Sequence, residues 1–314
     1  MQLIRGVYNL TTKSDLKSGC VLTIGNFDGV HLGHQQILNR LREKSAEFGL
    51  PSVVMVFEPQ PREFFTKKHE HHTAPARLMR LRDKFHYLAQ TGVDYLLCVR
   101  FNQAFASQQP EAFIQHLLVD QLNVKYLSVG DDFHFGAKRA GNFDTLKQAG
   151  EQFGFMVENS HSHCVGHNRI SSSLIRKALQ ADDLALVEQL LGKPYSIRGR
   201  VAHGNKLGRT IGFPTANIML NRLVNPIQGV YAVEVETQQG KFQGIANVGN
   251  RPTINGTKPL LEVHLFDFAD TIYGQAIEVS FLHKVRSEIK FESFEALKLQ
   301  IEKDVASVKR YFSS

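Results

Sequence analysis

Up to residue 191, short apolar runs alternate with segments whose apolar residues recur at helical spacing. The apolar runs resemble buried strands and fall at 21–24, 52–57, 95–99, 125–129 and 155–158. The helical segments fall at 35–48, 76–90, 142–153 and 182–191, and further helices start at Pro110 and near Ser172. This alternation predicts an α/β domain of Rossmann-like class, with a doubly wound parallel sheet.

After Tyr195 the pattern changes to short alternating or β-branched runs separated by turn residues. These runs fall at 197–201, 229–235, 241–248, 260–266 and 276–282. They predict an antiparallel β-barrel or sandwich. A terminal helix should follow, with Ser293 as its N-cap. Its buried face would consist of Phe294, Leu297, Ile301, Val305, Val308 and Phe312.

Two domains are therefore expected, 1–184 and 185–314. A chain of 314 residues is too long for one ordinary core, which agrees with this division. Gly192, Lys193 and Pro194 form a helix stop that also marks a domain joint. The sequence does not decide whether residues 184–191 belong to the first domain or form a linker helix.

Composition and charge narrow the class of protein only modestly. The net charge of +7 suits nucleic acid or polyphosphate ligands, but the chain has no clustered Lys/Arg helix and no aromatic RNA-binding signature. Charge alone does not separate these two kinds of ligand, but the missing signatures argue against nucleic acid. Cys20, Cys98 and Cys164 form no Cys-x-x-Cys pair, which favours a reducing compartment. Without a signal-peptide pattern or a stretch of membrane-spanning length, we expect a cytoplasmic protein with no membrane partner. Self-association is left open.

Two histidines one helical turn apart, His31 and His34, follow the first predicted strand in a glycine-rich turn, 25–34. They should open a helix, and unpaired N–H groups at a helix start favour an anion such as phosphate. Two imidazoles on one helical face can donate hydrogen bonds to the phosphates of a nucleotide. Zinc binding is a weaker alternative, because the spacing is not His-Glu-x-x-His. A surface or capping role also remains open.

Other polar segments follow predicted strands, at the sheet edge where ligands of open α/β sheets bind. Residues 58–62 contain two prolines, and residues 130–141 are rich in glycine, aromatic and charged side chains. Ser171–173 and Arg176 should reach the same crevice, where Arg176 can clamp a phosphate. A serine run before a helix is otherwise usually a cap. With the histidine turn, these features suggest a nucleotidyltransferase.

Four ordered blocks, at 25–34, 57–61, 130–136 and 170–176, resemble the adenylyltransferase module of bacterial bifunctional riboflavin kinase/FAD synthetase. The resemblance implies that the triphosphate of ATP is positioned and neutralised by His31, His34, Ser172 and Arg176. The further residues that it places in the nucleotide or flavin site are Gly25, Phe27, Asp28, Gly33 and Asp132.

The second half of the chain resembles the riboflavin kinase barrel of the same family along nearly its whole length. The blocks that carry this resemblance are 199–201, 208–217, 229–231, 247–253, 262–264, 273–274 and 291–293. Because this half lacks a Gly-x-x-x-x-Gly-Lys-Ser/Thr loop, its ATP must be held by something other than a P-loop.

Thr215 and Asn217 offer uncharged oxygens suited to Mg²⁺ and phosphate, and the resemblance assigns them that role. It makes Glu262 the base that takes the proton of a primary hydroxyl attacking the γ-phosphate. It also places Gly208 in the nucleotide site and Arg286 near flavin and nucleotide. Without the resemblance, Glu262 would be interpreted as an outward strand residue, Thr215 and Asn217 as turn formers, and Arg286 as a solvated surface charge.

The expected function is phosphorylation of riboflavin to FMN with MgATP, followed by joining of FMN to AMP from a second ATP, which gives FAD and pyrophosphate. The resemblance thus implies the small-molecule partners riboflavin, FMN and ATP. Gln60, Ser173 and Asn250 depart from the family pattern, and we expect altered rate or affinity from them rather than loss of activity. Two alternatives are a kinase whose transferase half is impaired and a flavin- or RNA-binding regulator without enzyme activity.

Overall fold

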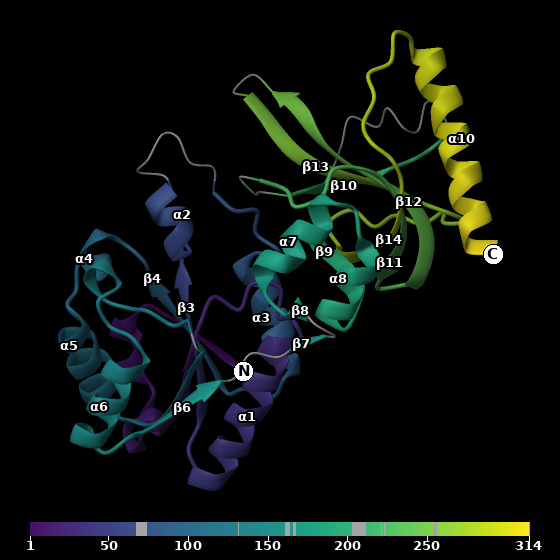
Figure 1. The fold of residues 1–314 in the computed structure, drawn as a ribbon. Coiled ribbons are helices and arrows are strands. Elements are labelled where there is room, and N and C mark those ends of the chain that lie inside the picture. Colours follow the sequence, from purple (N-terminus) through teal and green to yellow (C-terminus); the bar gives the residue numbers. More distant parts are fainter. Residues whose placement is uncertain are drawn as a thin grey trace. The chain divides into compact units, whose positions relative to one another are not determined.

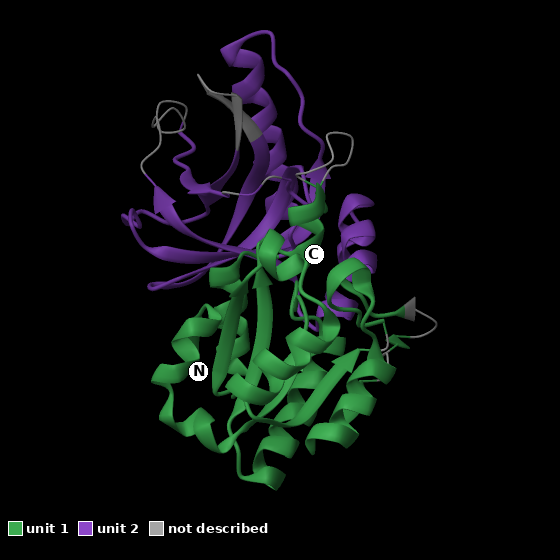
Figure 2. Ribbon diagram, turned by 90° about the vertical axis from the view of Figure 1, so that its left-hand side faces the viewer, with its two compact units in different colours: residues 1–75, 79–172 green, residues 76–78, 173–314 purple. Residues whose placement is uncertain are grey.

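The computed structural model describes residues 1–66, 74–130, 132–160, 164–165, 168–202, 212–220, 222, 224–253 and 256–313, and gives only the course of the chain at 250–253 and 256–258. It contains two compact units (Figure 2). The first unit consists of Met1–Pro75 and Met79–Ser172, and the second of Ala76–Leu78 and Ser173–Ser314. The predicted domain boundary between residues 184 and 185 remains a prediction.

A six-stranded parallel sheet forms the centre of the first unit (Figure 1). Its strands are β1 (Gln2–Arg5), β2 (Cys20–Ile24), β3 (Ser52–Glu58), β4 (Tyr95–Arg100), β5 (Val124–Gly130) and β6 (Met156–Ser160). They lie in the order β1-β4-β3-β2-β5-β6, and every neighbouring pair is parallel. The predicted doubly wound α/β class is therefore confirmed. Strand β1 is not predicted, because four residues with one buried side chain give too short a pattern.

The helical elements of this unit are η1 (Val7–Thr12), η2 (Ser14–Ser18), α1 (Leu32–Phe48), α2 (Pro61–Thr66), α3 (Leu81–Gln90), α4 (Gln103–Ala106), α5 (Pro110–Phe113), η3 (Ile114–Gln121), η4 (Ala137–Arg139) and α6 (Phe143–Phe153). A small antiparallel pair joins β7 (Cys164–Val165) to β8 (Asn168–Arg169). Alternate residues of the central strands pack on opposite faces of the sheet. Leu22 and Met55 join the core that contains Leu146 of α6, whereas Val54 packs in the core that contains Leu38 of α1.

Helix α3 begins at Leu81, so the predicted start at residue 76 is wrong. Residues 76–78 belong to the second unit, and their carbonyls accept side-chain hydrogen bonds instead of helical ones. The donors are Nε of Arg176 to Ala76, Nη1 of Arg222 to Arg77, and the hydroxyl of Tyr195 to Leu78. Pro61, expected in a loop, is the first residue of α2.

A closed antiparallel barrel forms most of the second unit, which decides between the predicted barrel and sandwich. Its strands are β9 (Tyr195–Ala202), β10 (Ala216–Met219), β11 (Gly229–Thr237), β12 (Gly240–Thr253), β13 (Gly256–Leu265) and β14 (Ala276–Arg286). They close in the order β10-β13-β12-β11-β14-β9. Helices α7 (Ser172–Gln180) and α8 (Leu184–Leu191) precede the barrel, and α10 (Phe294–Ser313) follows it.

Helix α10 packs on the outside of the barrel (Figure 1), and its buried face differs from the predicted one. Val308 is buried against Val230, Ala232 and Ile245, as expected. Phe294, however, is 51% exposed, so its place in the buried face was wrongly predicted. It is the first residue of the helix, a position where the apolar period continues although the barrel does not cover it. None of the described helices combines the length and apolar character that crossing a membrane requires.

Candidate functional sites in the two units

The histidine turn lies at the point where the strand order of the parallel sheet reverses. Strand β2 has β3 on one side and β5 on the other. From β2 the chain continues to β3 and β4 in one direction, and later to β5 and β6 in the other, so the order reverses between β2 and β5. The turn follows the carboxyl end of β2, and the loop that starts at Gly130 follows the carboxyl end of β5. Ligands of open α/β sheets bind at this position, so the first unit presents its turn where a nucleotide site is expected.

His31 and His34 come together as predicted, with stacked rings whose centroids lie 3.6 Å apart. His31 is buried and caps helix α1, because its Nδ1 accepts the backbone N–H of His34 at 3.2 Å. An imidazole that accepts through Nδ1 carries its ring proton on Nε2. The capping role is therefore present, and it also fixes the tautomer of His31.

The second histidine has a neutral ring. Burial holds the pKa of His34 well below its ordinary value of 6.5, and the neighbouring His31 and Lys84 lower this pKa further. The Nδ1 atom of His34 is buried and has no hydrogen-bond partner within the described part of the chain. A neutral His34 can assist a phosphate by donating a hydrogen bond, but not by carrying a full positive charge.

Lys84 supplies a positive charge beside the turn, and sequence reasoning missed it. The residue lies on α3, is 2% exposed, and donates from Nζ to the carbonyl of Asn26. Its place in the amphipathic pattern of α3 gives no signal, because a lysine there is normally read as a surface residue. A buried lysine contacting the histidine turn stabilises that turn and adds positive potential close to it.

Asp28 is tied into the turn through both its side chain and its backbone. Its carboxylate is 1% exposed and accepts the backbone N–H of Met79 at 3.1 Å. Its carbonyl accepts the hydroxyl of Ser172 at 2.8 Å. Phe27 and Val30 have positive φ angles of 46° and 42°, an uncommon conformation for such residues. These hydrogen bonds therefore hold a strained turn in place, and ligand contacts of Asp28 and Ser172 remain predictions.

The glycines of the turn make room for aromatic rings. A Cβ atom on Gly33 would lie 3.3 Å from Nδ1 of His31, and one on Gly25 would lie 3.1 Å from the ring of Phe27. The Phe27 ring in turn lies 4.8 Å from that of His34. A side chain at either glycine would therefore press on a ring of the histidine turn, and the close approach of a ligand at these glycines remains a prediction.

Asp132 and Arg176, the outer members of the predicted transferase site, make ordinary local contacts. Asp132 follows β5, has a side chain 84% exposed, and lies 3.9 Å from the guanidinium of Arg169. Arg176 is on α7 in the second unit, where its Nε donates to the carbonyl of Ala76 at 2.6 Å. Their contacts with substrate remain predictions.

Glu262 occupies the middle of a polar row that crosses three barrel strands. It pairs with Asn217 of β10 on one side and with Asn247 of β12 on the other. Directly opposite residues project from the same face of a sheet. Asn247 also pairs with Val230, which packs beneath α10, so the row lies on the outer face of the barrel. Asn247 was not among the predicted site residues, although it opens the block 247–253 that carries the resemblance and lies directly opposite Glu262.

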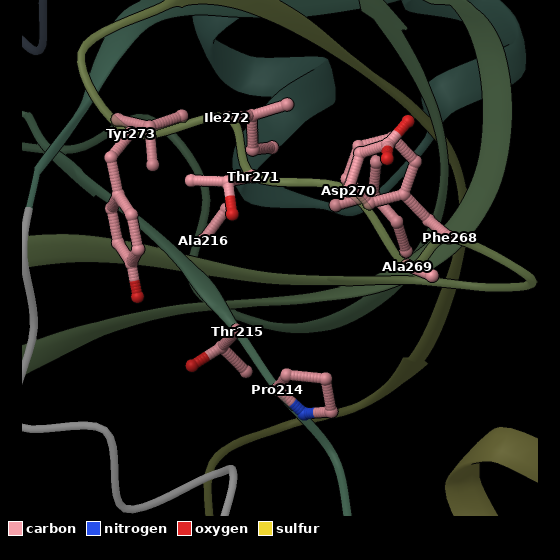
Figure 3. A pocket seen from close by; sticks show the side chains of 11 residues that line it. Pro214, Thr215, Ala216, Phe268, Ala269, Asp270, Thr271, Ile272 and Tyr273 are labelled. Carbon is pink, nitrogen blue, oxygen red and sulfur yellow. The ribbon is translucent and has the colours of Figure 1, made fainter.

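Thr215 lines a cavity of about 400 Å³ at the end of the barrel strands (Figure 3). The loop between β13 and β14 supplies most of the other walls, including the side chains of Phe268, Asp270 and Tyr273. The carbonyl of Thr215 accepts Nδ2 of Asn217 at 3.3 Å. Thr215 therefore links this cavity to the row that contains Glu262.

Arg286 is held by helix α10. Its Nε and Nη2 lie 2.9 and 2.8 Å from Oδ2 of Asp304, which is 4% exposed, and its Nη1 donates to the carbonyl of Ser287. This ion pair attaches the helix to β14, and a contact of Arg286 with flavin or nucleotide remains a prediction. Gly208 lies outside the described residues.

The fold therefore consists of an open parallel α/β sheet of the kind that binds nucleotides and a closed antiparallel barrel, and each carries its own candidate site. The description "FAD synthetase" belongs to the family model that matches residues 13–174, and "riboflavin kinase" to the one that matches residues 191–312. The chain belongs to the family of bifunctional riboflavin kinase/FMN adenylyltransferases.

This chain is similar to curated relatives and to a solved structure over nearly its full length. The bifunctional riboflavin kinase/FMN adenylyltransferase of Haemophilus influenzae is 59% identical over 315 residues, with 100% of both chains covered. The protein of the same name from Escherichia coli is 51% identical over 313 residues, covering 99% of this chain and 98% of that one. A crystal structure described as a macrolide-efflux protein from Streptococcus pneumoniae is 30% identical, with a TM-score of 0.77 and 98% and 99% of the two chains covered. This last similarity shows a shared fold.

Proposed function

We propose that this chain converts riboflavin to FMN in its barrel and FMN to FAD in its parallel-sheet unit, with one ATP consumed in each step. The observation that carries the proposal is the order of the two matched families along the chain, together with full-length identity of 59% to a relative named for both activities. The substrates are small molecules, and we infer a cytoplasmic location for the reaction.

In the barrel, Glu262 is the catalytic base. Its carboxylate accepts the proton of the riboflavin primary hydroxyl as that oxygen attacks the γ-phosphorus of ATP, and ADP leaves. The row that contains Glu262 supports this role, because Asn217 and Asn247 flank it and can orient polar groups on the same face. Riboflavin would therefore present its ribityl end to the outer face of the barrel.

Thr215 and Asn217 fit the needs of a magnesium ion bound with ATP. Their hydroxyl and amide oxygens are hard, uncharged donors, and the phosphates would supply the charged ligands that Mg²⁺ prefers. The bond from Nδ2 of Asn217 to the carbonyl of Thr215 turns the amide oxygen away from that carbonyl. When bound, Mg²⁺ would neutralise charge on the transferring phosphoryl group.

In the first unit, the FMN phosphate already provides a nucleophilic oxygen, so no strong base is required. That oxygen attacks the α-phosphorus of ATP, a bond to AMP forms, and pyrophosphate leaves. His31 and His34 donate hydrogen bonds to the phosphates, and the start of α1 adds the favourable end of a helix dipole. The family resemblance adds Ser172 and Arg176 to the residues that are expected to bind the triphosphate.

One incubation tests this function. Purified full-length protein receives riboflavin, ATP and Mg²⁺, and chromatography resolves the flavin products over time. FMN should appear first and FAD after it. FMN that accumulates without FAD would refute the transferase step and favour a kinase whose transferase unit is impaired. Gln60, which departs from the family pattern in that unit, would then be the first residue to test. The absence of both products would refute both steps and favour a flavin-binding regulator.

A further inference from the structure

The pairing between β10 and β13 begins at Ala216, so Thr215, the residue just before it, is not paired with β13. The first pair is Ala216 with Val263, and the next two residues outward on the β10 side are Thr215 and Pro214. Proline has no backbone N–H and cannot extend a strand pairing. The backbone at the cavity therefore needs some other group to fix it, because the sheet does not.

His264 provides that group. Its Nδ1 lies 2.8 Å from the carbonyl oxygen of Pro214. Since a carbonyl can only accept, Nδ1 carries the proton in this contact. The imidazole ring is packed edge-on against Phe213, at 5.4 Å between ring centroids, and against Phe266 at 5.8 Å. The ring is thus oriented by two aromatic neighbours so that its N–H points at the backbone.

Thr215 is in consequence fixed from both sides. Its carbonyl accepts the amide of Asn217, which is itself buried and paired in the ladder, and the carbonyl that precedes it is held by His264. Side chains that must meet a phosphate or a metal ion act best when the backbone that carries them is rigid.

We propose that His264 is a positioning residue for the kinase reaction, which holds the backbone at Pro214 so that the hydroxyl of Thr215 is presented to MgATP. The proposal rests on the proposed role of Thr215. His264 itself touches no reacting atom. Loss of the His264 hydrogen bond should therefore raise KM for MgATP in FMN formation. KM for riboflavin and the reaction of the first unit should not change.

Two substitutions separate the hydrogen bond from the packing of the ring. His264→Phe keeps an aromatic ring between Phe213 and Phe266 but removes the donor. His264→Asn loses the ring but places an amide N–H close to the position of Nδ1. In full-length protein, His264→Phe should raise KM for MgATP in FMN formation by about 3- to 10-fold, the worth of one hydrogen bond. His264→Asn should recover most of that loss.

Internal controls come from the same samples. KM for riboflavin and the rate of FAD formation from added FMN should both stay within twofold of the unsubstituted protein. The proposal is overturned if His264→Phe leaves KM for MgATP unchanged, or if it changes both ATP and riboflavin use equally. It is also overturned if His264→Asn is no better than His264→Phe, because the ring alone would then matter.

A third variant distinguishes failure of this inference from failure of the role of Thr215. Thr215→Ala should raise KM for MgATP, and adding His264→Phe to it should produce little further change, since His264 acts through Thr215. If Thr215→Ala has no effect, the proposed role of Thr215 is wrong and the inference falls with it. If Thr215→Ala has its effect and the two changes simply add, the role of Thr215 stands and the positioning role of His264 is wrong.

Discussion

His31 and His34 lie one turn apart but differ in hydrogen bonding and in electrostatic environment. His31 uses one ring nitrogen to cap α1, which fixes the proton on the other nitrogen. His34 is kept neutral by burial, His31 and Lys84. The spacing of the two histidines is visible in the sequence, and so is their place at a helix start. The buried Lys84 is not, because its contact with the Asn26 carbonyl depends on how α3 packs against the turn.

The lowered pKa of His34 predicts a pH-dependent stability. In the unfolded chain His34 binds a proton near pH 6.5, whereas in the folded protein it does so only at lower pH. Below pH 6.5 the unfolded state therefore binds more protons, and stability falls as the pH decreases. The free energy of unfolding should therefore decrease by up to about 1.4 kcal/mol for each pH unit below 6.5 because of His34, and His34→Gln should remove this part of the pH dependence.

The measurement is chemical denaturation of the first-unit transition at pH 5.0, 6.0 and 7.5, for both proteins. The variant should lose less stability than the unsubstituted protein between pH 7.5 and 5.0, with most of the difference below pH 6.5. Equal pH slopes in the two proteins would show that His34 does not have a lowered pKa.

Gly33 tests whether the position of the His31 ring matters for the transferase. In Gly33→Ala the added Cβ lies 3.3 Å from Nδ1 of His31, so the ring must shift by a few tenths of an ångström. We expect kcat/KM for FAD formation from FMN to fall by about 10-fold, because catalytic positioning tolerates little displacement. Asn39→Ala, at an exposed position of the same helix, is the matched control and should change nothing. A Gly33→Ala protein as active as this control would contradict the ring-positioning argument.

Among the elements, the ones with long periodic patterns were predictable and the short ones were not. Strands β2, β3 and β4 are continuous apolar runs because helices cover both faces of a parallel sheet. Strand β10 has four residues after Pro214, too few to show a period. The predicted start of α3 failed because Leu78 continues the helical spacing although its carbonyl is bound by Tyr195. Such contacts come from distant parts of the chain and leave no local trace.

Helix α10 is attached to the barrel by an ion pair as well as by its apolar face. Asp304 is buried and accepts from both Arg286 and Gln300. Asp304→Asn should lower the free energy of unfolding by about 2 kcal/mol, since it weakens charge-assisted hydrogen bonds in a buried setting. Glu302→Gln is the matched control on the same helix, because its 4.0 Å pair with Lys298 is exposed and worth little.

Urea denaturation of both variants checks this prediction. If Asp304→Asn is no less stable than Glu302→Gln, the pair with Arg286 does not attach the helix. Arg286 would then be available for the substrate contact that the family resemblance suggested.

At the scale of the whole molecule, two different folds occupy one chain, and each carries its own candidate site. The sequence identifies both folds, because the change from helical to alternating spacing near Tyr195 is strong and the ordered blocks extend along nearly the whole length. It does not reveal that Asn247 flanks Glu262, that His264 holds Pro214, or that Lys84 supports the histidine turn. Each of these depends on strand register or helix packing.

The central claim is that the two reactions belong to separate sites, and Glu262→Gln tests it most directly. The variant is given either riboflavin or FMN, each with ATP and Mg²⁺, and the products are resolved by chromatography. We predict that FMN formation from riboflavin falls by at least about 1000-fold, because the base is lost. FAD formation from added FMN should remain within twofold of the unsubstituted protein. Loss of both conversions, or retention of riboflavin phosphorylation, would contradict the account.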